Sequence, residues 1–403
     1  MKNRVTEIFN IEKPIIQGPL NSLTTPKFIA SVSEAGGLGI MGPNAGDARV
    51  TRSPVETTER MRKEIKKIKQ LTNKPFASTI MVSEDLTYVA YIVDMLIEEK
   101  VPVVLINGLL DEEIFTKLKD NNMKIIFRPI TPTTENAKAA EAMGADVFVA
   151  TGFDEGGTVP ERVIGTFSIV PMIADVINIP VIAAGGIGDV RGVRASFSLG
   201  AEGVYVGSVL IPTYENPAAE NVKQYIVDSK AEDLILFRTL PAYYRSLPGK
   251  LAKELEVMDK EGATNEELGQ HMGAGRNMRL GMVEGDTENG YVSVGTGISP
   301  IKSIRSVKEV IDDLMQDFKP HWCVLYYINE KRSIIMNETI NLLKNHSSIR
   351  NFENKAIPEE QINEIFEAAN QTSSFSLLQA VTIIRVTDKS IRKKIMKHGL
   401  LEN

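Results

Sequence analysis

Short runs of apolar residues, rich in Val and Ile, alternate with longer amphipathic stretches between residues 14 and 228. The runs are mostly apolar on both faces, which is typical of parallel strands covered by helices. Eight of them predict buried strands, at 14–20, 38–42, 76–81, 101–108, 124–130, 146–152, 180–186 and 203–208. Helix patterns fill the gaps, as at 53–71 and 133–145. Eight strand-then-helix units predict an α/β fold, the (β/α)₈ TIM barrel; an open doubly wound sheet is the alternative that periodicity leaves open.

The pattern changes after the eighth strand. A helix is expected around 215–229, and the polar, methionine-bearing region 230–290 that comes next fits no strand-then-helix repeat. We interpret this region as an elaboration that covers the mouth of the barrel. The amphipathic segment 303–317 then predicts a helix that closes the barrel.

A shift in composition follows, because the only Trp and the only Cys fall within 318–335. We therefore divide the chain into a barrel (1–318), a linker (319–335) and a small partial α+β segment (336–403). Within the last segment, helices are expected at 338–345 and 358–370, and a strand at 380–386. The segment is too short to form a stable hydrophobic core of its own, so the barrel or a partner chain would have to complete that core.

Charge and composition exclude several classes of function. The formal net charge is −6, which argues against a nucleic-acid-binding protein. No apolar run approaches the roughly 20 residues that span a membrane, and no leader segment is recognisable. A single cysteine allows no internal disulfide, and no Cys/His spacing predicts a metal site. We expect a cytoplasmic protein that acts on a small-molecule substrate, with a homodimer as an open possibility.

Glycines at the ends of the last two barrel strands carry the first chemical indication. Gly185 and Gly186 end the seventh strand, Asp189 follows where a helix begins, and Gly207 and Ser208 end the eighth strand. Loops after these two strands, together with a helix N-terminus, commonly bind phosphate in TIM barrels. A phosphate-anchored cofactor is the first interpretation; the alternative is that the glycines only make tight turns.

Four stretches carry a specific resemblance: PIIQGPLNSLTTPKFIASVSEAGGLGIMG, DVFVATGFDEGGT, PVIAAGGIGDVRGVRASFSLGAEGVYVGS and NGYVSVGTGISPIKS. In this order they resemble the nitronate monooxygenase family, which also contains NAD(P)H:quinone reductases and enoyl-ACP reductase II. The resemblance covers residues 1 to 318. It implies a TIM barrel that binds one non-covalent FMN, with NAD(P)H as a candidate electron donor.

The resemblance also implies which residues bind the cofactor. Gly185, Gly186, Gly207 and Ser208 would hold the FMN phosphate. Arg128 is a further candidate by its position alone: at the end of the fifth strand it would approach the electron-rich edge of the flavin, and a salt bridge at the rim is equally compatible with that position. The remaining implied residues, most of them expected at or near the isoalloxazine, are Gln17, Gly18, Pro19, Leu20, Ser78, Thr79, Gly156 and Gly157.

One motif departs from the family pattern. Where relatives read Glu-Ala-Gly-Gly-His, this chain reads Asp154-Glu155-Gly156-Gly157-Thr158, and residues 159–164 look inserted. A threonine hydroxyl does not exchange protons near neutrality as an imidazole does. The departure therefore argues against enoyl reduction and nitroalkane deprotonation, and leaves the oxidation of a preformed nitronate less affected.

Three residues of this motif are candidates for a catalytic role. Thr158 is expected to face the flavin and to hydrogen-bond a substrate oxygen. Asp154 is a candidate acid or base, as is Glu155 if its environment raises its pKa. The alternatives are that Asp154 caps a helix and that Glu155 points to solvent. Beyond the motif, the run 243–245 either lines the mouth or packs, and His271 is interpreted as a surface residue.

The expected function is that of an FMN-dependent oxidoreductase of the nitronate monooxygenase type. It would oxidise nitronates or NAD(P)H and pass electrons through the flavin to oxygen or another acceptor. Two alternatives remain open: an activity like that of enoyl-ACP reductase II, and a flavin-binding protein that has lost catalysis.

The carboxyl-terminal segment resembles the first third of a second flavin family, the NADPH-type nitroreductases. The matching residues are His346, Ser348, Arg350, Ser373, Ser374 and Gln379, with Ser347 where that family has Arg. Since nitroreductases complete their FMN site with later segments and a second subunit, we expect this segment to bind no flavin alone. A joining of two adjacent genes or a truncated fusion would account for it.

Overall fold

The structure, a computed structural model, describes residues 2–43, 45–46, 53–316, 358–361, 388 and 390. The chain divides into two compact units, residues 1–319 and 320–403. Several predictions for the carboxyl-terminal part lie outside the described residues: the linker at 319–335, the helix at 338–345 and the strand at 380–386. The nitroreductase-like residues lie outside them too, namely His346, Ser347, Ser348, Arg350, Ser373, Ser374 and Gln379. The barrel strands and the helices around them belong to the first unit.

Eight parallel strands form one sheet, in the order β1-β9-β8-β6-β5-β4-β3-β2. All eight coincide with the apolar runs, so the prediction of a TIM barrel is confirmed. Their bounds are β1 Ile15–Gln17, β2 Gly39–Met41, β3 Phe76–Val82, β4 Val103–Gly108, β5 Lys124–Arg128, β6 Val147–Thr151, β8 Val181–Ala184 and β9 Gly203–Val206.

The sheet closes between its first and last strands. A parallel bridge joins Ile16 to Leu38, and the backbone N–H of Gln17 donates to the carbonyl of Leu38 at 3.0 Å. The side chain of Gln17 reinforces this seam, because its Oε1 accepts the N–H of Ile40 at 2.9 Å. Gln17 is fully buried, so its amide holds β1 against β2.

A helix follows each barrel strand. Pro26 and Pro54, each preceded by a capping Thr or Ser, fix the starts of two of them. The helices are α2 Pro26–Glu34, α3 Pro54–Leu71, α4 Thr87–Glu98, α5 Glu112–Asp120, α6 Thr134–Ala142, α7 Thr166–Ala174, α8 Val190–Ser198 and α13 Val307–Leu314. The predicted closing helix is α13, which packs against α2 and α8 and so completes the ring.

Two apolar clusters explain why the strands are apolar on both faces. One fills the barrel interior and includes Ile16, Leu105, Ile126 and Ile182. The other lies between strands and helices and includes residues such as Ile80. Successive residues of a strand alternate between these clusters, since their side chains point to opposite faces.

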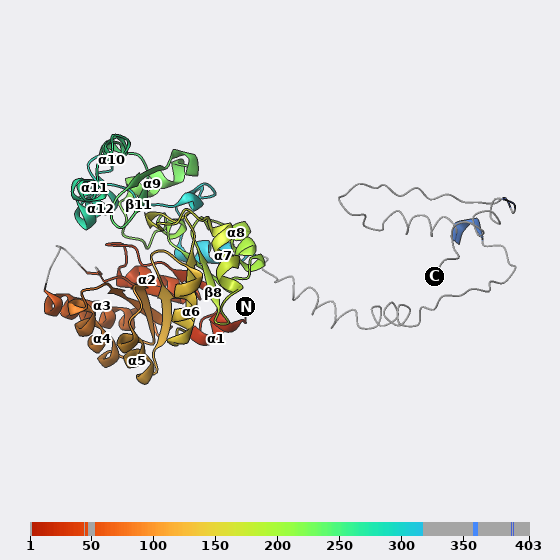
Figure 1. Cartoon of the computed structure of the whole chain (residues 1–403), viewed down its shortest axis with the longest axis horizontal. Coiled ribbons are helices and arrows are strands. Elements are labelled where there is room, and N and C mark those ends of the chain that lie inside the picture. Colours follow the sequence, from red (N-terminus) through yellow and green to blue (C-terminus); the bar gives the residue numbers. More distant parts are fainter. Residues whose placement is uncertain are drawn as a thin grey trace. The chain divides into compact units, whose positions relative to one another are not determined.

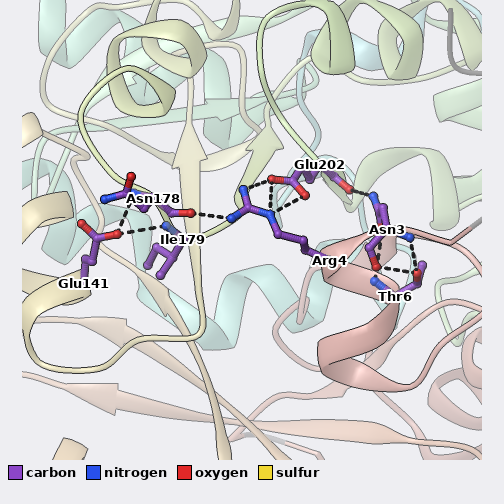
Figure 2. Close-up of polar contacts among 7 residues, drawn as sticks. All are labelled: Asn3, Arg4, Thr6, Glu141, Asn178, Ile179 and Glu202. Carbon is purple, nitrogen blue, oxygen red and sulfur yellow. Dashed lines mark hydrogen bonds and ion pairs between the residues drawn. The ribbon is translucent and has the colours of Figure 1, made fainter. Parts of the chain in front are cut away.

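Helix α1 (Arg4–Phe9) closes the amino-terminal end of the barrel. Val5 and Phe9 enter the interior cluster, and polar contacts fasten the helix to the loops that precede β8 and β9. Figure 2 shows these contacts: Arg4 pairs with Glu202 and donates to the carbonyl of Asn178, at 2.5 Å. The charged groups drawn there, those of Arg4, Glu141 and Glu202, all have partners.

An elaboration lies between β9 and α13, as the sequence predicted. Figure 1 shows its helices α10, α11 and α12 beside one another with β11, away from α1 and α5. Its elements are η1 Ser208–Leu210, α9 Glu220–Asp228, η2 Ala231–Asp233, β10 Ile235–Arg238, β11 Tyr243–Ser246, α10 Lys250–Lys260, α11 Asn265–Met272, α12 Ala274–Met282 and η3 Thr296–Ile298.

A second, three-stranded sheet was not predicted. It has the order β10-β11-β7, and β7 (Gly157–Val159) falls within the stretch that departs from the family motif. Residues Gly157, Thr158 and Val159 pair with Arg245, Tyr244 and Tyr243 in antiparallel register. The segment interpreted as an insertion therefore begins in a strand that ties the barrel to the elaboration.

Candidate active site

A cavity of about 390 Å³ opens at the carboxyl ends of the barrel strands, which is within the range of cofactor sites. Strand ends, the loop after β6 and the elaboration all contribute to its walls. The cavity brings together most of the residues proposed from the sequence: Gly18, Pro19, Leu20, Thr79, Arg128, Gly156, Gly157, Thr158, Gly185, Gly186, Gly207 and Ser208. Gln17, Ser78 and Asp154 are not among the lining residues.

Strand alternation explains the position of Ser78. Ala77 belongs to the cluster inside the barrel, whereas Phe76 and Ile80 belong to the cluster under the helices. Thr79 therefore points inward to the cavity, and Ser78 points outward to the helical layer. The structure does not place Ser78 beside the cavity, and Gln17, whose amide secures the β1–β2 seam, does not line it either.

The same alternation brings polar side chains into one layer at the top of the barrel. Thr79, Asn107, Arg128 and Tyr205 point inward from β3, β4, β5 and β9, above the aliphatic interior. Arg128 donates to Asn107 Oδ1 at 3.0 Å and lies 5.6 Å from the centre of the Tyr205 ring. The barrel thus ends in a polar floor for the cavity.

The turn after β8 has the conformation that phosphate-binding glycines require. Gly185 and Gly186 have φ of +98° and +73°, in the left-handed region that favours glycine. Among the described residues, the backbone N–H groups of Gly186, Gly207 and Ser208 have no protein acceptor. These amides border the cavity, so they can donate to an anion there.

The helix that follows contributes less than the sequence suggested. Asp189 caps α8, and its carboxylate accepts the N–H groups of Arg191 and Gly192 at 2.9 and 3.4 Å. The N-terminus of α8 therefore already has its own anion. Donors for a phosphate come from the turns themselves rather than from this helix.

The loop between β6 and β7 is held in place from several sides. Arg245 donates to the carbonyls of Phe153 and Glu155, and the N–H of Thr296 donates to the carbonyl of Asp154 at 3.0 Å. Gly156 lies so close to the 294–295 backbone that a Cβ would come within 2.2 Å of it. Only glycine fits at this position, which explains part of the Gly-Gly motif.

Asp154 has a structural position. Its Oδ2 accepts the N–H of Thr166, the first residue of α7, at 2.7 Å. The residue before that helix, Gly165, offers no side chain for the purpose. The carboxylate therefore caps α7, which is the alternative that the sequence left open for Asp154.

Glu155 does not point to solvent. Its Oε1 accepts from Nη2 of Arg128 at 2.5 Å, and the two side chains are only 17% and 11% exposed. Burial raises the pKa of the Glu155 carboxyl, while the charges of Arg128 and Arg245 oppose the rise. Arg128 thus makes the rim salt bridge that was one of its two interpretations, and its partner is a residue of the departing motif.

Thr158 lines the cavity from β7, where its side chain is exposed. Opposite it on β11 lies Tyr244, which shares a hydrogen bond with Ser293. Burial raises the pKa of the Tyr244 phenol to about 12, so it stays protonated near neutrality. The prediction that Thr158 faces a flavin stays untested, but the residue borders the cavity.

Several lining residues were missed at the level of sequence. Asn107 and Tyr205 are polar residues near the ends of otherwise aliphatic strands. This pattern could have predicted that they contribute to the site. Met278 and Ser293 come from the elaboration, and no local pattern foretells their approach to the cavity. His271 lies on the exposed surface beside Glu254, as expected.

A flavin mononucleotide fits the chemistry of this cavity. Three buried polar atoms at its wall, Thr79 Oγ1, Arg128 Nε and Glu155 Oε2, have no protein partner among the described residues. Buried polar groups rarely stay without partners. Three other such atoms, Ser78 Oγ, Thr151 Oγ1 and Asn216 Nδ2, lie away from this wall, so it is the gathering of three atoms at one cavity that indicates a polar ligand. Amide donors for a phosphate and polar side chains for a ring system are thus both present. The described residues offer no cluster of metal-ligating side chains, and no helix among them is long and apolar enough to cross a membrane.

Comparisons with known proteins show the family to which the chain belongs. The model of the family described as "Nitronate monooxygenase" matches residues 2–90 and 87–317. Probable nitronate monooxygenases of Staphylococcus aureus are 33% identical to the chain over an alignment of 294 residues, and the match covers 62% of this chain and 78% of theirs. The model of the "Nitroreductase family" matches residues 343–401, in agreement with the second resemblance.

Solved structures show the same relationship. FabK of Thermotoga maritima is 33% identical, with a TM-score of 0.71 over 81% of this chain and 99% of FabK. A nitroalkane oxidase from Streptomyces ansochromogenes is 22% identical and has a TM-score of 0.64, over 77% of this chain and 96% of its own, so it shares the fold.

Proposed function

Since the chain belongs to the nitronate monooxygenase family and is an oxidoreductase, we propose that it binds FMN in the barrel-mouth cavity and oxidises nitronates or NAD(P)H. Electrons would pass through the flavin to oxygen or another acceptor. The observation that carries this proposal is the cavity itself, in which unpartnered amides border one part and unpartnered polar side chains another.

The turns after β8 and β9 would hold the FMN phosphate. Their glycine amides are the donors available, because Arg128 and Glu155 are the only charged residues among those described as lining the cavity. The polar floor of the barrel would meet the ring system. FMN, when bound, supplies the redox chemistry, and the protein supplies binding, orientation and a largely enclosed environment.

Arg128 suits an anionic substrate such as a nitronate. Its guanidinium is fixed by Asn107 and Glu155, and its Nε has no partner among the described residues. A fixed donor that is shielded from bulk water attracts an anion more strongly than a solvated one does. Thr158 would add a hydroxyl donor from the opposite wall.

An anaerobic titration of the purified, flavin-loaded full chain tests the proposal. A nitronate is expected to bleach the oxidised flavin spectrum, and readmission of air is expected to restore it. NADH and NADPH, added in separate titrations, establish whether either is a donor. Bleaching by none of the three would contradict the proposal and favour a flavin-binding protein without this activity.

The same protein distinguishes the enoyl reductase alternative. Consumption of NAD(P)H that depends on an enoyl thioester, without any turnover of nitronates, would replace the proposed reaction by alkene reduction. The two outcomes are separate, because nitronate oxidation requires no reduced nicotinamide.

A further inference from the structure

The carboxylate of Glu155 has one oxygen in use and one free. Oε1 accepts from Arg128, whereas Oε2 is buried at the cavity wall and has no partner among the described residues. A buried carboxylate oxygen without a donor is costly unless a ligand or a proton meets it. Glu155 therefore presents a proton acceptor to whatever occupies the cavity.

The backbone around Glu155 is fixed, so this oxygen has a defined place. Arg245 binds the carbonyl of Glu155 itself, and Gly156 packs directly against the 294–295 backbone. Arg128 fixes the other end of the side chain and is anchored in turn by Asn107. A base held at both ends loses little freedom when a substrate arrives.

The ion pair also solves a problem of charge. Before a proton moves, the charges of Arg128 and Glu155 cancel, and the substrate is neutral. After Glu155 takes a proton, the positive Arg128 remains to face the anion that has just formed. The net charge of this pair and the substrate together is therefore zero before and after the transfer, so the step adds no net charge to a poorly solvated place.

We propose that Glu155 is the base of this cavity and removes a proton from a carbon atom of a neutral carbon acid. Arg128 is the counter-ion of Glu155 before the transfer and of the product anion after it. This inference rests on the proposed function, because the product for a nitroalkane is the nitronate that would then be oxidised. The absence of the family histidine argued against deprotonation of a nitroalkane. In this proposal Glu155 performs that step in place of the histidine.

The step balances without an oxidant. The C–H bond beside the nitro group breaks, its electron pair moves into the C–N bond and onto a nitro oxygen, and the proton forms an O–H bond on Glu155. The charged and titratable side chains facing Glu155 are Arg128, Arg245 and Tyr205. Burial raises the pKa of Tyr205, so this phenol stays neutral. Burial lowers the pKa of Arg245, but a guanidinium keeps its proton in proteins, so both arginines stay charged.

The test measures proton exchange rather than oxidation. The full chain carrying its flavin is incubated with nitroethane in D₂O without oxygen, and loss of the α-proton signal is followed by NMR. The protein should accelerate exchange, and the rate should rise with pH as Glu155 loses its proton. Glu155→Gln should lower the exchange rate by about a hundredfold or more, the usual weight of a general base.

Two further variants keep the test decisive. Glu161→Gln removes an exposed carboxylate from the same segment and should exchange like the wild type. If Glu155→Gln alone does not fold, because Arg128 is left unpaired, the double variant Arg128→Met/Glu155→Gln removes both charges and should fold without exchanging. Exchange at the wild-type rate in either Glu155 variant would overturn the assignment.

Failure of the two proposals is distinguishable. If the wild-type protein oxidises preformed nitronate but does not accelerate proton exchange, the assignment of Glu155 as a base is wrong and the proposed function stands. If it accelerates proton exchange but does not oxidise nitronate, the proposed function is wrong and Glu155 remains a base.

Discussion

The two ends of the barrel each carry an arginine–glutamate pair, and the pairs differ in what surrounds them. At the amino end, Arg4 and Glu202 are 56% and 24% exposed, and further donors and acceptors complete the cluster shown in Figure 2. At the carboxyl end, Arg128 and Glu155 are far more buried, yet Arg128 Nε and Glu155 Oε2 have no protein partner among the described residues.

The contrast separates structural polar groups from functional ones. A cluster whose members satisfy one another, as around α1, only has to hold a helix on the barrel. A buried cluster with unsatisfied atoms costs free energy, and it is retained where a ligand completes it. Charge alone would not have told the two ends apart, whereas the accounting of hydrogen bonds does.

Removal of one arginine at a time should give the largest difference between the ends. Arg128→Met leaves the Glu155 carboxylate buried without its counter-ion, so we expect a loss of about 3–5 kcal/mol in the free energy of unfolding. Arg4→Met removes a solvent-exposed pair and should cost no more than about 1 kcal/mol. Urea unfolding of the two variants measures both values.

A double variant serves as the control. Arg128→Met/Glu155→Gln removes both charges, so it should recover much of the stability lost in Arg128→Met. Equal losses for Arg4→Met and Arg128→Met would contradict the distinction between the two ends.

A smaller effect is expected at Asp154, whose carboxylate is engaged like those of the amino end. Asp154→Ala should destabilise the protein by about 1 kcal/mol, because α7 loses its cap. Asp154→Asn keeps an acceptor and should retain most of the stability. Nitronate turnover at full flavin loading should change little in either variant; a large loss in Asp154→Asn would make Asp154 catalytic after all.

Thr158 should have a modest effect on substrate binding. Thr158→Val removes the hydroxyl from the cavity and should raise KM about fivefold, the equivalent of one hydrogen bond of about 1 kcal/mol. Thr158→Ser should restore it. Unchanged steady-state kinetics in Thr158→Val would show that this hydroxyl does not contact the substrate.

The smallest effect concerns pH. The raised pKa values of Tyr244 and Tyr205 mean that the folded protein keeps both phenolic protons where the unfolded chain releases them, above about pH 10. Stability should therefore fall as pH rises beyond that point. Tyr244→Phe should make this fall shallower in thermal unfolding; a slope identical to that of the wild type would contradict the burial of that phenol.

The repeating parts of the molecule could be predicted from the sequence. Buried parallel strands are apolar on both faces, so all eight left a clear pattern, and Gly185 and Gly207 marked the turns that border the cavity. Because both faces of these strands are apolar, the sequence does not show which face points into the barrel. Ser78 and Thr79 are adjacent and similar, and only the register of the folded barrel assigns Thr79 to the cavity and Ser78 to the helical layer.

Contacts between distant segments were beyond local pattern. Strand β7 exists because Gly157–Val159 pairs with β11, far along the chain, and three residues carry no periodicity of their own. Glu155 is paired with Arg128 from strand β5, and the capping of α7 depends on Asp154 from the preceding loop. These pairings decide the roles of the carboxylates, which composition and spacing left open.

The central claim is that backbone amides after β8 and β9 hold the phosphate of FMN, and a comparison of FMN with riboflavin tests it most directly. Both ligands are titrated into flavin-free full chain, and binding is followed by quenching of flavin fluorescence. Two charge-assisted hydrogen bonds from the three free amides to the phosphate would already contribute at least about 3 kcal/mol of binding free energy. FMN should therefore bind about a hundredfold or more tightly than riboflavin, which has no phosphate. Equal affinities for the two ligands would contradict the account.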